Sequence, residues 1–132
     1  MYRKILYNYV FNQQFLIEYN LYNVKIYDIT SKQKEKIYFD FTCEVEITNI
    51  NVNPCVSNIA LISYVDGTCR IFNLLNKDSK ELILFEGINN YKILYSEFNR
   101  LNPNIIASIN IESTIIVWDV RELSFIQVIE SE

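Results

Sequence analysis

One short strand pattern recurs three times along the chain, at spacings of 45 and 46 residues. The three copies are 24–29 (VKIYDI), 69–74 (CRIFNL) and 115–120 (IIVWDV). Each is an apolar run that carries an aromatic residue, then Asp or Asn, then an aliphatic residue. A period of roughly 20–50 residues is typical of proteins built from stacked units, so we predict a repeat protein.

The pattern between the copies is almost entirely that of strands. β-branched and aromatic residues dominate, and short polar breaks recur at the spacing that is typical of sandwiches, barrels and propellers. Residues 91–99 also have some character of a short helix, but Tyr91, Ile93 and Tyr95 alternate as in a strand. We predict twelve strands in three groups of four: 4–11, 14–19, 23–29 and 36–42; 46–52, 57–64, 68–75 and 81–86; 91–99, 104–110, 114–120 and 124–130.

The breaks between these strands contain turn residues. Asn53-Pro54 and Asn102-Pro103 occupy matching places, and Pro belongs in a connection because it lacks the N–H that a sheet ladder needs. Asp66-Gly67 joins two apolar runs and is a strong hairpin signal. The third copy has Glu112-Ser113 instead, which predicts a longer or less regular turn.

Composition and charge exclude several classes of protein. The 132 residues carry a net charge of −4, and the only basic cluster, Lys32, Lys34 and Lys36, is interrupted by Glu35. Nucleic-acid binding is therefore not expected, since it needs a basic surface. The three cysteines are odd in number and form no CxxC pair, which favours small buried thiols in a reducing compartment. Without a signal peptide or an apolar span, we expect an intracellular protein, cytoplasmic or nuclear, that does not enter a membrane.

The third copy resembles a known family. Residues 102–108 (NPNIIAS) leading to 116–120 (IVWDV) closely resemble a WD repeat, the second copy is similar but diverged, and the first keeps only 24–29. The resemblance implies antiparallel four-stranded blades round a central channel, and a scaffold that presents loops to protein partners. We place the blades at 4–42, 46–86 and 91–130, in one domain spanning 1–132. The structural repeat positions are Tyr27, Asp28, Phe72, Asn73, Trp118 and Asp119.

The chain departs from this family in one respect. WD repeats often carry a Gly-His pair whose histidine joins a buried polar network with the Trp, but this chain has no histidine, and Gly87-Ile88 stands where the third repeat would have the pair. Trp118 must therefore find another acceptor for its indole N–H or leave it near water. Ser63 and Ser108 are expected to face polar or solvated neighbours, and the blades to depend on apolar packing more than on polar networks.

Three blades do not close a ring, because propellers have about four to eight. Each open face would measure about 300 Å² in projection, which corresponds to about 8 kcal/mol of missing burial. We expect the ring to be incomplete and the chain to be part of a longer propeller, so that its partners include the rest of the propeller. The alternatives are a ring completed by a blade-donating subunit or by copies of the chain, and twelve strands rearranged into a closed sandwich or barrel.

Signatures of an enzyme are absent from the sequence. Without histidine there is no Ser–His or Cys–His dyad and no histidine metal site, and no glycine-rich phosphate loop occurs. Glu44 and Glu46 share a strand face, where a solvated edge explains them better than an acid–base pair does. We therefore predict a non-catalytic protein that uses neither a cofactor nor a metal.

Two sets of residues are candidates for binding a partner. The loops that enter the innermost strands, with the hairpin turns beyond them, carry an acidic and amide-rich set that suits a basic peptide: Glu44, Asp66, Glu86, Asn89, Asn90 and Glu112. The second set is Asp119 and Arg121, which end a segment resembling the WDxR box at 118–121. That resemblance implies an alternative function, a substrate receptor or adaptor of a cullin-type ubiquitin ligase, although Thr30 and Leu75 replace the arginine in the other two copies.

Overall fold

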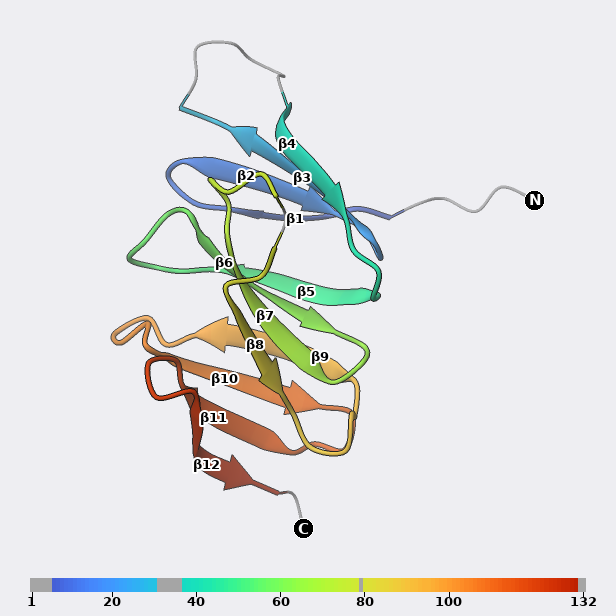
Figure 1. The fold of residues 1–132 in the computed structure, drawn as a ribbon, viewed down its shortest axis with the longest axis vertical. Coiled ribbons are helices and arrows are strands. Elements are labelled where there is room, and N and C mark those ends of the chain that lie inside the picture. The colour runs from blue at the N-terminus through green and yellow to red at the C-terminus, as the bar shows by residue number, and fades with distance from the viewer. Residues whose placement is uncertain (1–5, 31–36, 79, 131–132) are drawn as a thin grey trace, which may run out of the picture.

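The computed structural model describes residues 6–30, 37–78 and 80–130, and this part of the chain contains strands and no helix (Figure 1). The predicted basic cluster at 32–36 lies outside these residues. Twelve strands form three antiparallel sheets of four, here called blades 1, 2 and 3. Blade 1 comprises β1 (Asn8–Phe11), β2 (Phe15–Tyr19), β3 (Asn23–Asp28) and β4 (Ile37–Thr42). Blade 2 comprises β5 (Ile47–Val52), β6 (Ile59–Tyr64), β7 (Thr68–Asn73) and β8 (Ile83–Glu86), and blade 3 comprises β9 (Ile93–Phe98), β10 (Ile105–Asn110), β11 (Ile115–Asp119) and β12 (Ser124–Ile129).

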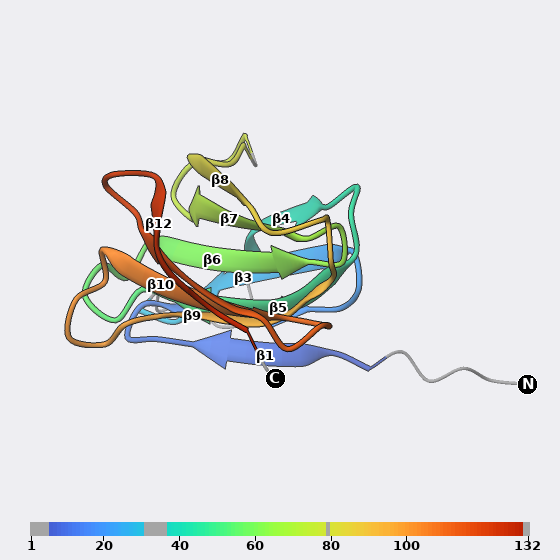
Figure 2. The same cartoon turned by 90° about the horizontal axis from the view of Figure 1, so that it is seen from below.

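Within each blade the spatial order of the strands follows the chain. The all-β prediction, the twelve strands and their grouping into three open blades are confirmed, whereas the helical reading of 91–99 is wrong because β9 occupies that segment. The three sheets stack face to face along the long axis of the molecule, and none of them closes on itself (Figures 1 and 2). The closed sandwich or barrel is therefore excluded, and the arrangement is that of an incomplete propeller.

Two apolar cores hold the stack together, one on each side of blade 2. The core between blades 1 and 2 contains Ile17, Ile26 and Ile62, and the core between blades 2 and 3 contains Leu61 and Ile106, all buried. Neighbouring residues of β6 contribute to both cores, because successive side chains of a strand point to opposite faces. A strand that is covered on both faces has a nearly continuous apolar sequence. This explains the sequence IALISY of β6.

Burial of the cysteines agrees with the sequence prediction only in part. Cys69 is buried in the core between blades 2 and 3. Cys43 is half-buried, and Cys55 is exposed in the connection between β5 and β6. The prediction of buried thiols is therefore right for Cys69 and wrong for Cys55, which lies beyond the end of its strand where no second sheet covers the chain.

The β10–β11 connection, 111–114, is one residue longer than its counterpart in blade 2, 65–67, but the pairing of the two hairpins is the same. Five residues separate the last paired positions in both hairpins, Ser63 and Cys69 in blade 2 and Ile109 and Ile115 in blade 3. Ser113 adopts a φ of 62° where Gly67 has 87°, so the serine accepts the left-handed conformation that the turn requires. The prediction of a longer turn is thus confirmed by one residue in the strand bounds, and the third turn also carries backbone strain of about 1 kcal/mol.

Replacing Ser113 by glycine should stabilise the fold. The substitution removes the left-handed strain, and the larger conformational entropy of glycine in the unfolded chain offsets part of that gain, which leaves about 0.5 kcal/mol. Urea denaturation would measure the change. The matched control is Ser124→Gly in β12, a strand position without positive φ, where glycine should destabilise by a similar amount; equal effects of the two substitutions would contradict the strain at Ser113.

Candidate functional site

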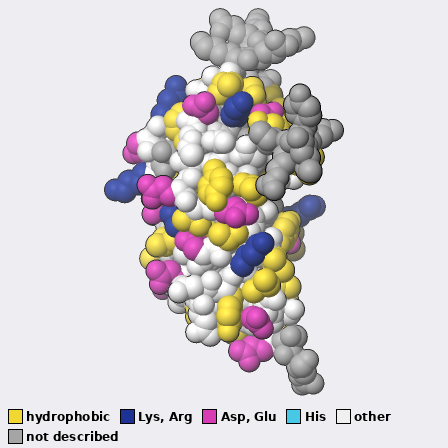
Figure 3. All heavy atoms as spheres, turned by 90° about the vertical axis from the view of Figure 1, so that its right-hand side faces the viewer, with side chains coloured by type: hydrophobic (Ala, Val, Ile, Leu, Met, Phe, Trp, Pro, Cys, Tyr) yellow, Lys and Arg dark blue, Asp and Glu magenta, His cyan; other side chains and the backbone are white. Residues whose placement is uncertain are grey.

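The connections of the three blades gather at two opposite ends of the stack. Because every strand runs antiparallel to the one before it, alternate connections lie at the same end. One end, here called the entry end, holds the segments 20–22, 43–46, 65–67, 87–92 and 111–114, and from it the chain enters the innermost strands β5 and β9. This end lies on the right in Figure 1 and faces the viewer in Figure 3. The connections 12–14, 53–58, 99–104 and 120–123 lie at the opposite end.

The structure brings most of the predicted binding residues together at the entry end. Acidic side chains lie among apolar ones on this face in Figure 3. Asn89 and Asn90 both adopt positive φ, of 53° and 57°, which fixes the course of the chain between β8 and β9. Six of the eight predicted residues belong to this end: Glu44, Asp66, Glu86, Asn89, Asn90 and Glu112. Their role as partner contacts stays a prediction.

Asp119 and Arg121 lie at the opposite end, so the eight residues do not form one surface. Oδ1 of Asp119 accepts hydrogen bonds from the backbone N–H groups of Arg121 (2.9 Å) and Glu122 (3.0 Å). The same turn occurs in the other blades, where Asp28 and Asn73 each accept the backbone N–H of the residue two positions on. This position of the repeat therefore closes the turn after the third strand of each blade.

The aromatic position of the repeat faces the preceding blade. Phe72 is buried against blade 1 and Trp118 against blade 2, while Tyr27 lies half-buried on the outward face of blade 1. The Trp118 ring packs edge-on against Phe85 at a centroid distance of 5.1 Å, and its Nε1–H donates to Ser108 Oγ at 3.4 Å. Ser108 is buried, so the acceptor that Trp118 required is provided inside the core, without solvent.

A buried polar network joins blades 2 and 3. The side-chain amide of Asn49 donates to the backbone oxygen of Ser96 and accepts from the backbone N–H of Ser96, both at 3.1 Å. Oδ1 of Asn51 accepts the backbone N–H of Phe98 at 3.0 Å, and the Ser63 hydroxyl hydrogen-bonds that of Ser96. β9 is the innermost strand of blade 3, so the backbone groups on one of its edges have no partner in the same sheet. The two asparagine side chains form hydrogen bonds with these backbone groups.

The apolar cores on both sides of blade 2 agree with the prediction that the blades depend more on apolar packing than on polar networks, and this network adds a buried polar contribution between blades 2 and 3. The network also places Ser63 among polar neighbours but away from solvent. The sequence signal was the pair of asparagines at alternate positions of β5, which places both side chains on the same face of the sheet. A similar contact joins blades 1 and 2, where the backbone N–H of Ile50 in β5 donates to Tyr19 OH at 3.3 Å.

The outward face of blade 3 repeats the face of blade 2 that lies inside the molecule. Positions 46 residues apart correspond, so the half-exposed Ile105, Ala107 and Val117 stand where Ile59, Leu61 and Ile71 pack against blade 3. Tyr95 and Glu97 of β9 occupy the positions that Asn49 and Asn51 hold in β5 of blade 2. The Tyr95 hydroxyl donates a hydrogen bond to Glu97 Oε2 at 3.1 Å. Figure 2 views the stack from this side.

The outward face of blade 1 is different in character. Its side chains include the aromatic residues Tyr9 and Phe11, which are 60% and 70% exposed, and a contact of 4.0 Å between Lys25 Nζ and Glu18 Oε1. The outward face of blade 3 is thus largely aliphatic, whereas the outward face of blade 1 is aromatic and charged.

Comparison with known proteins leaves the family open: no family model matches the chain, and no curated protein is similar to it. In the part of the chain that the structure describes, no three His, Cys, Asp or Glu side chains are arranged so that they could hold a metal ion. No helix there is long and apolar enough to cross a membrane.

Proposed function

We propose that the chain is a segment of a WD-like β-propeller and acts as a non-catalytic intracellular scaffold, in the cytoplasm or the nucleus, on which other proteins dock. The observation that carries this proposal is the outward face of blade 3. Its aliphatic residues Ile105, Ala107 and Val117 occupy the positions at which Ile59, Leu61 and Ile71 of blade 2 pack against another blade inside the molecule. A sheet face of this kind is suited to receive a further blade.

The further blade is proposed to come from the rest of a longer propeller, with a blade-donating subunit as the alternative source. Tyr95 and Glu97 support this, since both carry oxygen atoms that can accept backbone N–H groups, as the Asn49 and Asn51 side chains do for β9. A scaffold of this design needs no catalytic group, because its function is to hold loops in fixed relative positions.

The entry end is the proposed docking surface, and its chemistry favours a basic peptide segment. Carboxylates from four separate connections or strand ends face one side of the stack, namely Glu44, Asp66, Glu86 and Glu112. Because these side chains are spread over all three blades or their junctions, a bound peptide would span the stack. Electrostatic attraction of this kind governs the rate and selectivity of docking more than its affinity.

Reversing the charge of the entry end should abolish docking. We expect the double variant Glu86→Lys/Glu112→Lys to lose a partner that the wild-type chain captures, because both side chains are exposed and the change replaces attraction of a basic segment by repulsion. Binding of the captured partner, purified and measured by calorimetry with both proteins, would provide the readout, and circular dichroism would show that the fold is retained.

The matched control is Arg121→Ala at the opposite end, which should leave the same partner bound. Loss of binding with Arg121→Ala and not with the double variant would move the docking surface to the opposite end. That result would favour the ligase-adaptor alternative, in which Asp119 and Arg121 face the adaptor.

A further inference from the structure

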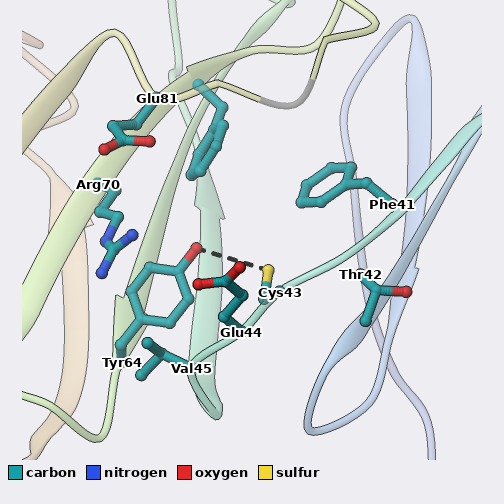
Figure 4. A pocket seen from close by; sticks show the side chains of 9 residues that line it. Phe41, Thr42, Cys43, Glu44, Val45, Tyr64, Arg70 and Glu81 are labelled. Carbon is teal, nitrogen blue, oxygen red and sulfur yellow. Dashed lines mark hydrogen bonds between the residues drawn. The ribbon is translucent and has the colours of Figure 1, made fainter.

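A pocket of about 330 Å³ opens at the entry end between blades 1 and 2 (Figure 4). Its walls come from the end of β4, from the 43–46 connection, from β6 and β7, and from the chain just before β8. The pocket therefore lies at the junction of two blades, next to Glu44 and Asp66 of the proposed docking surface.

Aromatic rings and neutral polar groups form the inner walls of this pocket. Phe41 and Phe72 stack at a centroid distance of 5.8 Å, and Tyr64 lies opposite Phe41 in Figure 4. Cys43 Sγ lies 3.6 Å from Tyr64 OH. Burial raises the pKa of both the Cys43 thiol and the Tyr64 hydroxyl, so both groups stay protonated and uncharged near neutral pH.

The charges at the mouth of the pocket favour a cation. Arg70 is already engaged, since its Nη2 lies 3.3 Å from Asp66 Oδ2 and its Nε–H donates to Thr68 Oγ1 at 3.3 Å. Glu44 and Glu81 line the pocket and have no hydrogen bond or ion pair to any described residue. Asp66 balances the charge of Arg70, so among the described residues that line the pocket the two glutamates leave an uncompensated negative charge.

The same junction already places cations against aromatic rings. The Arg70 guanidinium lies 4.7 Å from the centroid of the Tyr64 ring, and Lys77 Nζ lies 4.5 Å from the centroid of the Tyr38 ring. Contacts of this kind attract ammonium groups through the negative face of the ring, and more strongly where water is partly excluded.

We propose that this pocket binds the alkylammonium head of a lysine side chain presented by a protein partner. The ammonium group would lie between the Glu44 and Glu81 carboxylates, with its methylene stem along Phe41 and Phe72. Lysine fits better than an anion because the pocket is negative, and better than an uncharged side chain because the carboxylates would then lose water without a partner. This inference rests on the proposed docking function and specifies what the entry end recognises.

The test is a titration of the intact chain with Nα-acetyl-lysine amide, followed by amide chemical shifts in NMR. We expect shifts confined to the pocket, at Cys43 and Tyr64 among others. The norleucine counterpart, which has a similar stem and no charge, should bind about tenfold more weakly, as expected from ion pairing together with a cation–ring contact. Equal binding of the two probes, or no shift at the pocket, would overturn the proposal.

Substitution of the two carboxylates separates this site from the rest of the entry end. The double variant Glu44→Gln/Glu81→Gln keeps the shape of both side chains and should weaken binding of the lysine probe about fivefold. Glu112→Gln, at the same end but outside the pocket, should leave it unchanged. An unchanged affinity in the double variant would refute the assignment. A different result would separate the two proposals. If the wild-type chain binds the lysine probe but the Glu86→Lys/Glu112→Lys variant still captures the partner, the proposed docking function is refuted and the lysine pocket stands.

Discussion

Replacing Gly67 by alanine should lower the free energy of unfolding by about 3 kcal/mol. Gly67 has a φ of 87°, which costs an L-residue about 1–2 kcal/mol. A Cβ atom at this position would also lie 2.7 Å from the backbone carbonyl carbon of Asn90 and 2.8 Å from its Cα. Backbone atoms cannot move aside as a flexible side chain does, so overpacking adds about 1–3 kcal/mol.

Urea denaturation of Gly67→Ala would measure this loss, and the matched control is Ser113→Ala. Ser113 holds the equivalent turn position of blade 3 with a left-handed backbone and already has a Cβ. Its substitution removes only a hydroxyl and should change stability by less than about 0.5 kcal/mol. A loss below about 1 kcal/mol for Gly67→Ala would show that the 87–92 connection yields to the added methyl group.

The close approach of the Asn90 backbone to Gly67 could not be predicted from the sequence. The Asp66-Gly67 pair identified a hairpin, and that local prediction is confirmed by the pairing of β6 with β7. The chain has only two glycines, and they meet in space, with the Gly87 N–H donating to the Gly67 oxygen at 3.0 Å. Turn chemistry is local and visible in sequence, whereas the approach of a connection 20 residues away depends on how the whole blade folds.

The strands could be predicted because their alternation is repeated three times and each copy supports the others. β10 and β11 match the predicted 104–110 and 114–120 to within one residue at each end. To predict that β6 is buried on both faces, one would need to know that blade 2 lies between the other two blades. The sequence alone does not distinguish a strand covered twice from one covered once, except through the continuity of its apolar run.

The positions of the binding residues were predictable in principle from the number of strands. In an antiparallel sheet the connections alternate between the two ends, so the turn after Asp119 falls at the opposite end from the turn that holds Glu112. The pocket between blades 1 and 2 was not predictable. Glu44 and Glu81 are 37 residues apart, and only the packing of two separate sheets brings them to one cavity.

Replacing Asn49 by alanine should cost about 3 kcal/mol, because it removes both hydrogen bonds to the backbone of Ser96. Ser96 is fully buried on the free edge of β9, so no water replaces the lost partner. Each buried backbone group left unpaired costs about 1–3 kcal/mol. The loss should appear in urea denaturation, and the Ser96 amide should exchange its hydrogen faster than those of β10, which remain paired within the sheet.

Asn51→Ala is the matched control, since Asn51 is half-buried and accepts only one hydrogen bond, from the Phe98 N–H. It should cost about 1 kcal/mol and affect the Phe98 amide only. Equal losses from the two variants would mean that removal of side-chain volume, and not the unpaired edge, decides the effect. An Asn49→Ala variant as stable as wild type would show that the polar network does not hold blades 2 and 3 together. In that case the apolar core between blades 2 and 3 would hold the two blades together by itself, and the hydrogen bond between the Ser63 and Ser96 hydroxyls would only accompany it.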